Sequence, residues 1–186
     1  SMDAGKTWEK ILYVDQGTGA AELSMDANNP LVLYAAMWEH QRKPNKVISG
    51  GPGSGLYKST DGGNTWKEMT KGLPEEKGKM AIAVSAANSN KVYALVESDS
   101  NQDKGGLFVS NDAGDSWHMV SGDNRLVQRA WYYIEVFADP NDENTVYVLS
   151  ASMFRSEDSG KTWETISVPH GDTHDLWINP NNSKNI

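Results

Sequence analysis

The stretch STDGGNTW, residues Ser59 to Trp66, places an aspartate, two glycines and a tryptophan within eight positions. The same motif returns three times, as SMDAGKTW from Ser1, SNDAGDSW from Ser110 and SEDSGKTW from Ser156. The motif aspartates recur 58, 51 and 46 residues apart, which is typical of a supersecondary unit with loops of variable length. The chain is therefore expected to consist of repeats, with the motif at one corner of each.

Each interval between motifs contains the same kinds of segment. Around the second motif they run GAAELSMDA (19–27), LVLYAAMW (31–38), GLYKS (55–59) and TWKEMT (65–70), with Asn-, Pro- and Asp-rich turns between them. Apolar residues alternate with polar ones, and β-branched and aromatic residues are frequent, which favours strands over helices. The corresponding segments elsewhere are TWEKILYV (7–14), KMAIAVSAA (79–87), KVYALVES (91–98), GLFVS (106–110), SWHMV (116–120), YYIEVFADP (132–140), TVYVLSAS (145–152), MFRS (153–156), TWETISV (162–168) and HDLWINP (174–180).

The repeat unit is therefore predicted to be a four-stranded antiparallel sheet, and radial repetition of such sheets gives an all-β fold, the β-propeller. About three complete blades and two partial ones are expected. Propellers close with about four to eight blades, so the chain is interpreted as a fragment of a larger ring, or as one of several copies that complete a ring. The division runs 1–18 (end of one blade), 19–70, 80–121 and 131–168 (three blades) and 174–186 (start of the next).

The motif order Ser-x-Asp-x-Gly-x-Thr/Ser-Trp fits a tight hairpin between the third and fourth strands. Asp61 is placed to accept hydrogen bonds from nearby backbone N–H groups, as in an Asx turn. Gly63 supplies a positive φ that a side chain would penalise. Ser59 and Thr65 flank the turn with hydroxyl groups, and Trp66 is expected to bury its indole against the hairpin or the adjacent blade.

The alternative is a calcium site or a catalytic carboxylate, because aspartate–glycine loops bind Ca²⁺. An EF-hand loop, however, brings ligands from about five or six positions. Each motif here offers only one or two carboxylates, so the structural interpretation is preferred. The residues to which it assigns a structural role are Asp3, Gly5, Trp8, Ser59, Asp61, Gly63, Thr65, Trp66, Ser110, Asp112, Gly114, Trp117, Ser156, Asp158, Gly160, Thr162 and Trp163.

The composition of the 186 residues restricts the class of protein. Hydrophobic residues make up 38% and charged residues 23%, as in a globular domain. The 17 basic and 25 acidic residues leave a formal net charge of −8, which argues against a nucleic-acid partner. No apolar run approaches the roughly 20 residues of a membrane helix, so membrane insertion is not expected. The absence of cysteine excludes disulfides, thiol nucleophiles and cysteine metal ligands.

The four motifs resemble the Asp-box of bacterial-neuraminidase-type (BNR) repeats, S-x-D-x-G-x-T-W, and the repeats cover nearly the whole chain. The segments GGPGSGLYKSTDGGNTW (50–66), RAWYYIEVFADP (129–140) and HGDTHDLWINPNN (170–182) are similar to those of large bacterial Asp-box proteins related to the sortilin propeller and often labelled glycosyl hydrolases. Xyloglucanases with paired propellers and photosystem assembly factors share the box. The resemblance implies a propeller with the boxes on its outer rim and an extracytoplasmic location, secreted or in the cell envelope. It does not by itself imply catalysis.

In a four-stranded blade, the first and third turns lie on one face and the remaining loops lie on the other. Because the boxes are third turns, a ligand pocket is expected on the opposite face, near the central channel. Three stretches there depart most from the repeat, namely 38–54, 123–133 and 169–175. Departure from the repeat in loops is the functional signal that we follow.

The first stretch, interpreted as a long loop, offers Trp38, Glu39, His40 and Arg42, a polar strand end with a stacking ring. Its glycines, Gly50 to Gly55, lack the Lys-Ser/Thr ending of a phosphate-binding loop.

The second stretch pairs planar donors with aromatic rings, a mixture that suits a sugar or a carboxylate-bearing ligand. The alternative is that the rings alternate into core and channel while Arg129 pairs with a blade carboxylate such as Glu135. The predicted ligand-binding residues of this stretch are Arg125, Gln128, Arg129, Trp131 and Tyr132.

The third stretch concentrates histidines and carboxylates. On an extended backbone, His170, Asp172 and His174 point to one side and are candidate ligands for a divalent metal such as zinc. Asp172 and Asp175 are also candidates for a general acid or base. The alternative is that these side chains tie the loop to the next blade, and no cofactor is required.

Two classes of function follow. The preferred one is a ligand-binding or scaffold domain for a glycan or a protein or peptide partner. The alternative is part of a secreted glycoside hydrolase acting on polysaccharide, which requires two carboxylates about 5–9.5 Å apart across a cleft. No complete catalytic set is evident, and the Phe-Arg-Ile-Pro-type segment of sialidases is absent, so enzymatic activity stays open.

Overall fold

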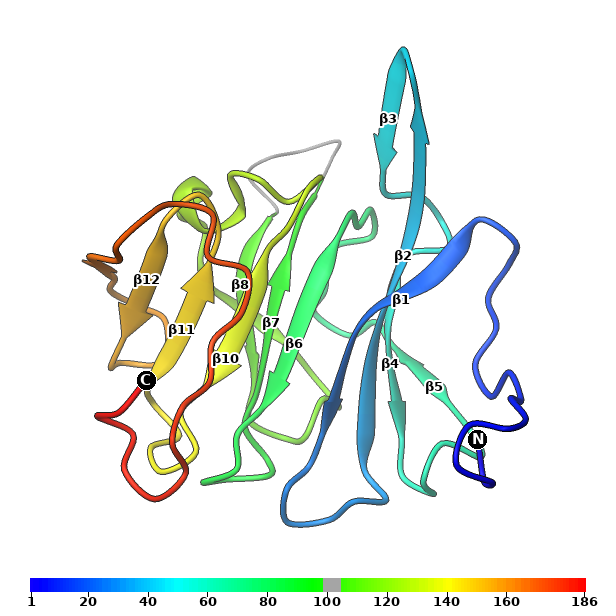
Figure 1. Cartoon of the computed structure of the whole chain (residues 1–186), viewed down its shortest axis with the longest axis horizontal. Coiled ribbons are helices and arrows are strands. Elements are labelled where there is room, and N and C mark those ends of the chain that lie inside the picture. Colours follow the sequence, from blue (N-terminus) through cyan, green and yellow to red (C-terminus); the bar gives the residue numbers. More distant parts are fainter. Residues whose placement is uncertain (99–104) are drawn as a thin grey trace.

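A computed structural model describes residues 1–98 and 105–186 and arranges them as three antiparallel β-sheets in chain order (Figure 1). The first sheet has the order β1-β2-β4-β5, with β3 paired to the far end of β2. Its strands are β1 (Thr18–Met25), β2 (Leu33–Lys43), β3 (Lys46–Ser49), β4 (Gly55–Ser59) and β5 (Lys67–Met69).

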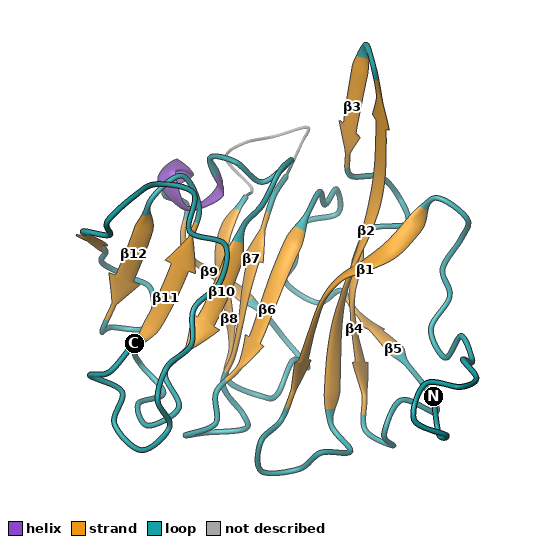
Figure 2. Ribbon diagram, in the orientation of Figure 1, coloured by secondary structure: helices purple, strands orange, loops and turns teal. Residues whose placement is uncertain are grey.

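The second and third sheets repeat this order in four strands each. The second consists of β6 (Met80–Val84), β7 (Val92–Val96), β8 (Gly106–Ser110) and β9 (His118–Ser121). The third consists of β10 (Glu135–Ala138), β11 (Val146–Leu149), β12 (Met153–Ser156) and β13 (Glu164–Ile166). Among the described residues, one 3-10 helix, η2 (Asn124–Val127), joins the two sheets (Figure 2).

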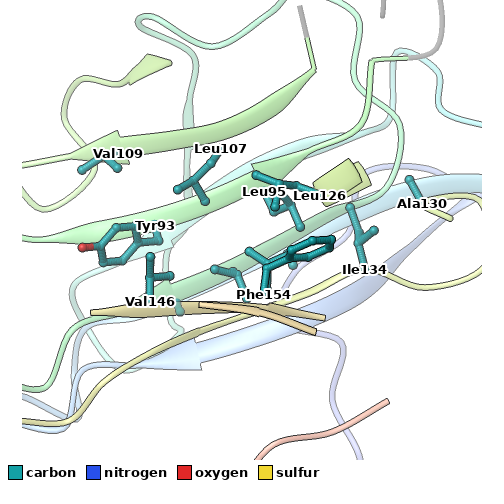
Figure 3. Packing of buried hydrophobic residues seen from close by; sticks show 13 residues of the cluster. Tyr93, Leu95, Leu107, Val109, Leu126, Ala130, Ile134, Val146 and Phe154 are labelled. Atoms are coloured by element: carbon teal, nitrogen blue, oxygen red, sulfur yellow. The ribbon is translucent and has the colours of Figure 1, made fainter. Parts of the chain in front are cut away.

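The core lies between the sheets because each strand alternates its side chains between two faces. One face of the second sheet packs on the first sheet through residues such as Tyr34 and Ile82. Its other face packs on the third sheet through Tyr93, Leu107 and Phe154, as Figure 3 shows. The second sheet is therefore covered on both sides, and every residue of β7 and β8 is buried.

The two edges of the sheets differ in what they carry. The turns between β4 and β5 and between β8 and β9, which hold two of the motifs, lie along the lower edge in Figure 1. The β2–β3 hairpin, η2 and the first part of the segment after β13 lie along the upper edge, and the rest of that segment runs down to the lower edge (Figures 1 and 2). The innermost strands β1 and β10 both contact β6, so the three sheets converge on one side.

The structure corrects two kinds of expectation drawn from the sequence. Residues 7–14 and 174–180, predicted as strands of partial blades, have no strand partner here and adopt irregular conformations. The stretch 38–54, predicted as a long loop, instead extends β2 to Lys43 and returns as β3, a protruding hairpin with Lys43 opposite Lys46.

No helix in residues 1–98 or 105–186 is long and apolar enough to cross a membrane.

Candidate functional site

The four Asp-boxes share one hydrogen-bond network, which the second box illustrates. The Oδ1 of Asp61 accepts the Thr65 backbone N–H at 2.8 Å, and its Oδ2 accepts the Thr65 hydroxyl at 2.6 Å. The Ser59 hydroxyl donates to Asp61 Oδ1 at 2.8 Å and accepts the buried Gly63 N–H at 2.9 Å. Both oxygens of Asp61 are thus engaged within the hairpin.

These bonds stabilise the ionised carboxylates. The Thr65 and Ser59 donors lower the pKa of Asp61 to about 2. The equivalent donors lower the pKa of Asp112 and of Asp158 to about 2, and the pKa of Asp3 is lowered by Thr7. A carboxylate with so low a pKa is a poor general acid or base near neutral pH, so the geometry supports a structural role for the boxes.

The box tryptophans are buried to different degrees. Trp117 is buried in the core between the first and second sheets, and Trp163 packs against the core between the second and third. Trp66 donates its indole N–H to the Gly63 carbonyl at 3.0 Å. Trp66, which was expected to be buried, is half-buried. Trp8 is 81% exposed because the described chain places no sheet against the first box.

The upper edge brings together residues from the second and third stretches. The guanidinium of Arg129, after η2, forms an ion pair with the carboxylate of Asp172, which lies 43 residues further on. This contact replaces the Arg129–Glu135 pair considered from the sequence, since Glu135 pairs with Lys79 at 3.2 Å. Arg129 and Asp172 are 42% and 58% exposed at their side chains, so the pair faces solvent.

Aromatic rings from the same two stretches contact one another near this ion pair. The His174 imidazole stacks on Tyr133, with ring centroids 4.1 Å apart, and meets Tyr132 edge-on at 5.4 Å. Tyr133 is buried, whereas Trp131 and Tyr132 are 47% and 49% exposed. A surface hollow of about 530 Å³ lies beside them and is lined by Gln128, Arg129, Trp131, Ala151, Gly171 and Asp172. We call this arrangement the Arg129 cluster.

Arg125 does not join the Arg129 cluster. Its side chain turns back to Asp123, the N-cap of η2, and its Nε lies 3.0 Å from the Asp123 carboxylate. This ion pair lowers the pKa of Asp123. The local Asp-x-Arg spacing is the signal in the sequence that would have removed Arg125 from the predicted ligand-binding set.

The three candidate metal ligands, His170, Asp172 and His174, are not grouped together in this structure. Asp172 has a φ of +60°, so the backbone is not extended there, and its carboxylate is held by Arg129. His174 stacks on Tyr133, while His170 Nδ1 lies 2.6 Å from the Gly171 carbonyl oxygen. Among the described residues, no three His, Asp or Glu side chains come close enough to hold a metal ion. Asp175, the other candidate acid or base, accepts the Leu176 N–H at 2.8 Å.

The β2–β3 hairpin forms a second group on the same edge. The rings of Trp38 and His40 lie 4.1 Å apart, and the Glu39 carboxylate accepts the Gly53 N–H at 2.9 Å. Arg42 is exposed further along the hairpin. The sequence placed both groups on one face, but no hydrogen bond, ion pair or ring contact recorded among the described residues joins the hairpin to the Arg129 cluster.

Two models of known protein families match this chain. The family model described as sortilin, neurotensin receptor 3 (Sortilin-Vps10), matches residues 1–131. The chain belongs to the Sortilin-Vps10 family. The model for the BNR-Asp box repeat matches residues 153–166 of the same chain, which contain the fourth Asp-box.

This Sortilin-Vps10 family chain is also similar to xyloglucanases. It is 26% identical over 158 residues to the oligoxyloglucan-reducing end-specific xyloglucanase of Emericella nidulans, covering 80% of the chain and 18% of the relative. It is 26% identical over 196 residues to xyloglucanase Xgh74A of Acetivibrio thermocellus, covering 89% and 22%. The chain thus spans about a fifth of the length of these relatives.

A solved structure supports the fold. The GH74 xyloglucanase of Xanthomonas campestris superposes with a TM-score of 0.61 at 18% identity, covering 87% of this chain and 24% of the other. At this level of identity the likeness concerns the fold alone. The all-β fold of four-stranded antiparallel blades, expected from the sequence as a β-propeller, is therefore confirmed for this member of the Sortilin-Vps10 family.

Proposed function

We propose that this chain is a glycan-binding segment of a glycoside hydrolase that acts on polysaccharide. The observation that carries the proposal is the 26% identity to two xyloglucanases across 80–89% of the chain. This identity favours the second function considered from the sequence, part of a glycoside hydrolase, over a ligand-binding scaffold that catalyses no reaction. The substrate class we propose is a β-glucan-type plant polysaccharide such as xyloglucan.

The Arg129 cluster has the chemistry of a sugar site. Trp131 and Tyr132 present rings to solvent, and an aromatic face stacks on the apolar face of a pyranose ring. Arg129 and Asp172 supply planar donors and acceptors beside them, which suit sugar hydroxyls. Gln128 adds an amide at the wall of the hollow.

The carboxylates on this edge are better suited to binding than to proton transfer. The Asp172 carboxylate is engaged by the Arg129 guanidinium, and the Asp175 carboxylate accepts the Leu176 N–H. Hydrolysis of a glycoside requires one carboxyl group that is protonated when the bond breaks. We therefore assign Asp172 to ligand binding and place the catalytic pair outside the Arg129 cluster.

We also propose that further blades complete the ring, with the division of the chain into blades stated above. An apolar hollow of about 1050 Å³ lies against the open face of the first sheet. Its lining includes Ile11, Tyr13, Leu23, Met25, Leu33 and Trp66. The equivalent face of the second sheet is covered by the first, so a blade of the same protein or of a second copy is the expected occupant.

Binding of xyloglucan oligosaccharides by calorimetry, with reducing-sugar release measured on the same samples, tests the proposal. Trp131→Ala is expected to weaken binding by about 5- to 150-fold, if stacking of a sugar ring on the indole contributes about 1–3 kcal/mol, as stacking of a nucleic-acid base on an aromatic side chain does. Trp8→Ala is the control, since Trp8 also faces solvent but belongs to a box. Equal loss in both variants, or no binding to any glycan by the unaltered protein, would overturn it.

A further inference from the structure

Three charged side chains from three different sheets meet where the inner strands converge. Glu22 lies on β1, Lys79 directly precedes β6 and Glu135 begins β10. Lys79 is 7% exposed, and its ammonium Nζ lies 3.2 Å from Glu135 Oε1. This group belongs neither to an Asp-box nor to the Arg129 cluster.

Glu22 joins the first sheet to the second through the backbone. Its Oε2 accepts the Ile82 N–H at 2.8 Å, and two residues along the strand the Ser24 hydroxyl accepts the Val84 N–H at 3.1 Å. The strand β6 is the inner edge of its sheet, so these N–H groups have no strand partner. Side chains from β1 satisfy them instead, which removes the cost of unpaired donors.

The charges in the group do not balance if both carboxyl groups are ionised. The charged groups that face Glu22 are Glu135 from β10 and Lys79 from the start of β6. A single ammonium then serves two carboxylates, and because both side chains are half-buried, each negative charge also carries a desolvation cost. A proton held between Glu22 and Glu135 removes one charge and supplies a donor for a hydrogen bond between them.

We propose that the Glu22–Glu135–Lys79 group is a proton-dependent clasp that holds the three blades together at their inner strands. With the proton present, Glu22 donates to Glu135 and accepts from Ile82, while Glu135 also accepts from Lys79. Loss of the proton leaves two carboxylates facing each other and weakens the contact between the first and third sheets. The clasp is independent of the glycan-binding role proposed above.

The pH range follows from the pKa of Glu22, which burial and Glu135 raise from 4.5 to about 9. Between these two pH values, Glu22 keeps its proton in the folded state and releases it in the unfolded chain. Stability is therefore full below about pH 4.5 and falls as the pH rises toward 9. The unfolding constant is expected to increase by up to about tenfold per pH unit in this interval, the limit for one proton.

Urea unfolding of the whole chain between pH 5 and 9, followed by tryptophan fluorescence, tests the clasp. Glu22→Gln keeps the shape and the acceptor for Ile82 without the ionisation. It is expected to match the unaltered protein at pH 5, to be the more stable at pH 8 and to have a flatter profile. Glu164→Gln is the control, because Glu164 pairs with Arg155 on the exposed outer strand, and it is expected to leave the slope unchanged.

Each other outcome contradicts the proposal. A flat profile in the unaltered protein would show that no proton is held, and an unchanged slope in Glu22→Gln would assign the proton to another group. Failure of Glu22→Gln to fold would also overturn it, since glutamine imitates the protonated form. Glu135→Gln provides a second check, because removing the facing carboxylate lowers the pKa of Glu22 and moves the upper end of the slope to lower pH.

Discussion

Replacing Ser110 by alanine is expected to destabilise the protein, chiefly by leaving one buried backbone donor unpaired. Ser110 is fully buried, and its hydroxyl accepts the Gly114 N–H at 2.8 Å and donates to Asp112 Oδ1 at 2.7 Å. The methyl group of alanine replaces neither bond. Because the Gly114 N–H has no access to water, the loss is about 1–3 kcal/mol. For a chain of this length it corresponds to a Tm lowered by about 2–12 °C.

The first box supplies a control with the same chemistry. Ser1 makes the same bonds, accepting the Gly5 N–H at 2.7 Å and donating to Asp3 at 2.9 Å, but it is exposed. Water replaces the hydroxyl there, so Ser1→Ala is expected to change stability by no more than about 0.5 kcal/mol. Thermal and urea unfolding of both variants measure the difference. Equal effects at Ser110 and Ser1, or loss of glycan binding in Ser110→Ala without loss of stability, would refute a structural role for the box.

Three more predictions concern the boxes. Gly160→Ala is expected to destabilise the folded protein by about 1–3 kcal/mol in urea unfolding, because φ is +90° and the new Cβ would lie 2.2 Å from Leu107 Cδ2. Gly171→Ala is the control and should be neutral, because a Cβ there meets nothing within 4 Å. Ala113→Gly is expected to be neutral or to stabilise by up to about 1 kcal/mol, since Ala113 has a φ of +56°; a loss of stability would contradict this reasoning. The folded pKa of Asp158, about 2, lies below its ordinary value of 3.8, so its contribution is present above about pH 4 and is lost toward pH 2. Acid unfolding of Asp158→Asn should show a shallower pH dependence than the unaltered chain.

The strands that the sequence located best are the third strands of the three sheets. GLYKS, GLFVS and MFRS were predicted as third strands, and the structure gives them as β4, β8 and β12 with the same bounds. Residues 7–14 and 174–180 have the same alternation but no strand, because alternation creates a strand only where a neighbour completes the hydrogen bonds.

The site was predictable in part. The sequence identified the edge of the sheets and the stretches that meet there, since loops that depart from a repeat are visible as departures. It did not pair Arg129 with Asp172, nor stack His174 on Tyr133. Glu22 received no role at all, because a glutamate on an alternating strand is ordinarily a solvent-facing residue.

The sequence by itself determined the hairpin of every Asp-box, the four-stranded repeat and the all-β fold. Each box closes its hydrogen bonds within eight residues, so local order alone specifies it. Only the tertiary structure decided which boxes are buried, which loops meet at the Arg129 cluster and which carboxyl groups come together from different sheets. These properties depend on desolvation and on the distances between groups from different sheets, and no local stretch of sequence encodes those distances.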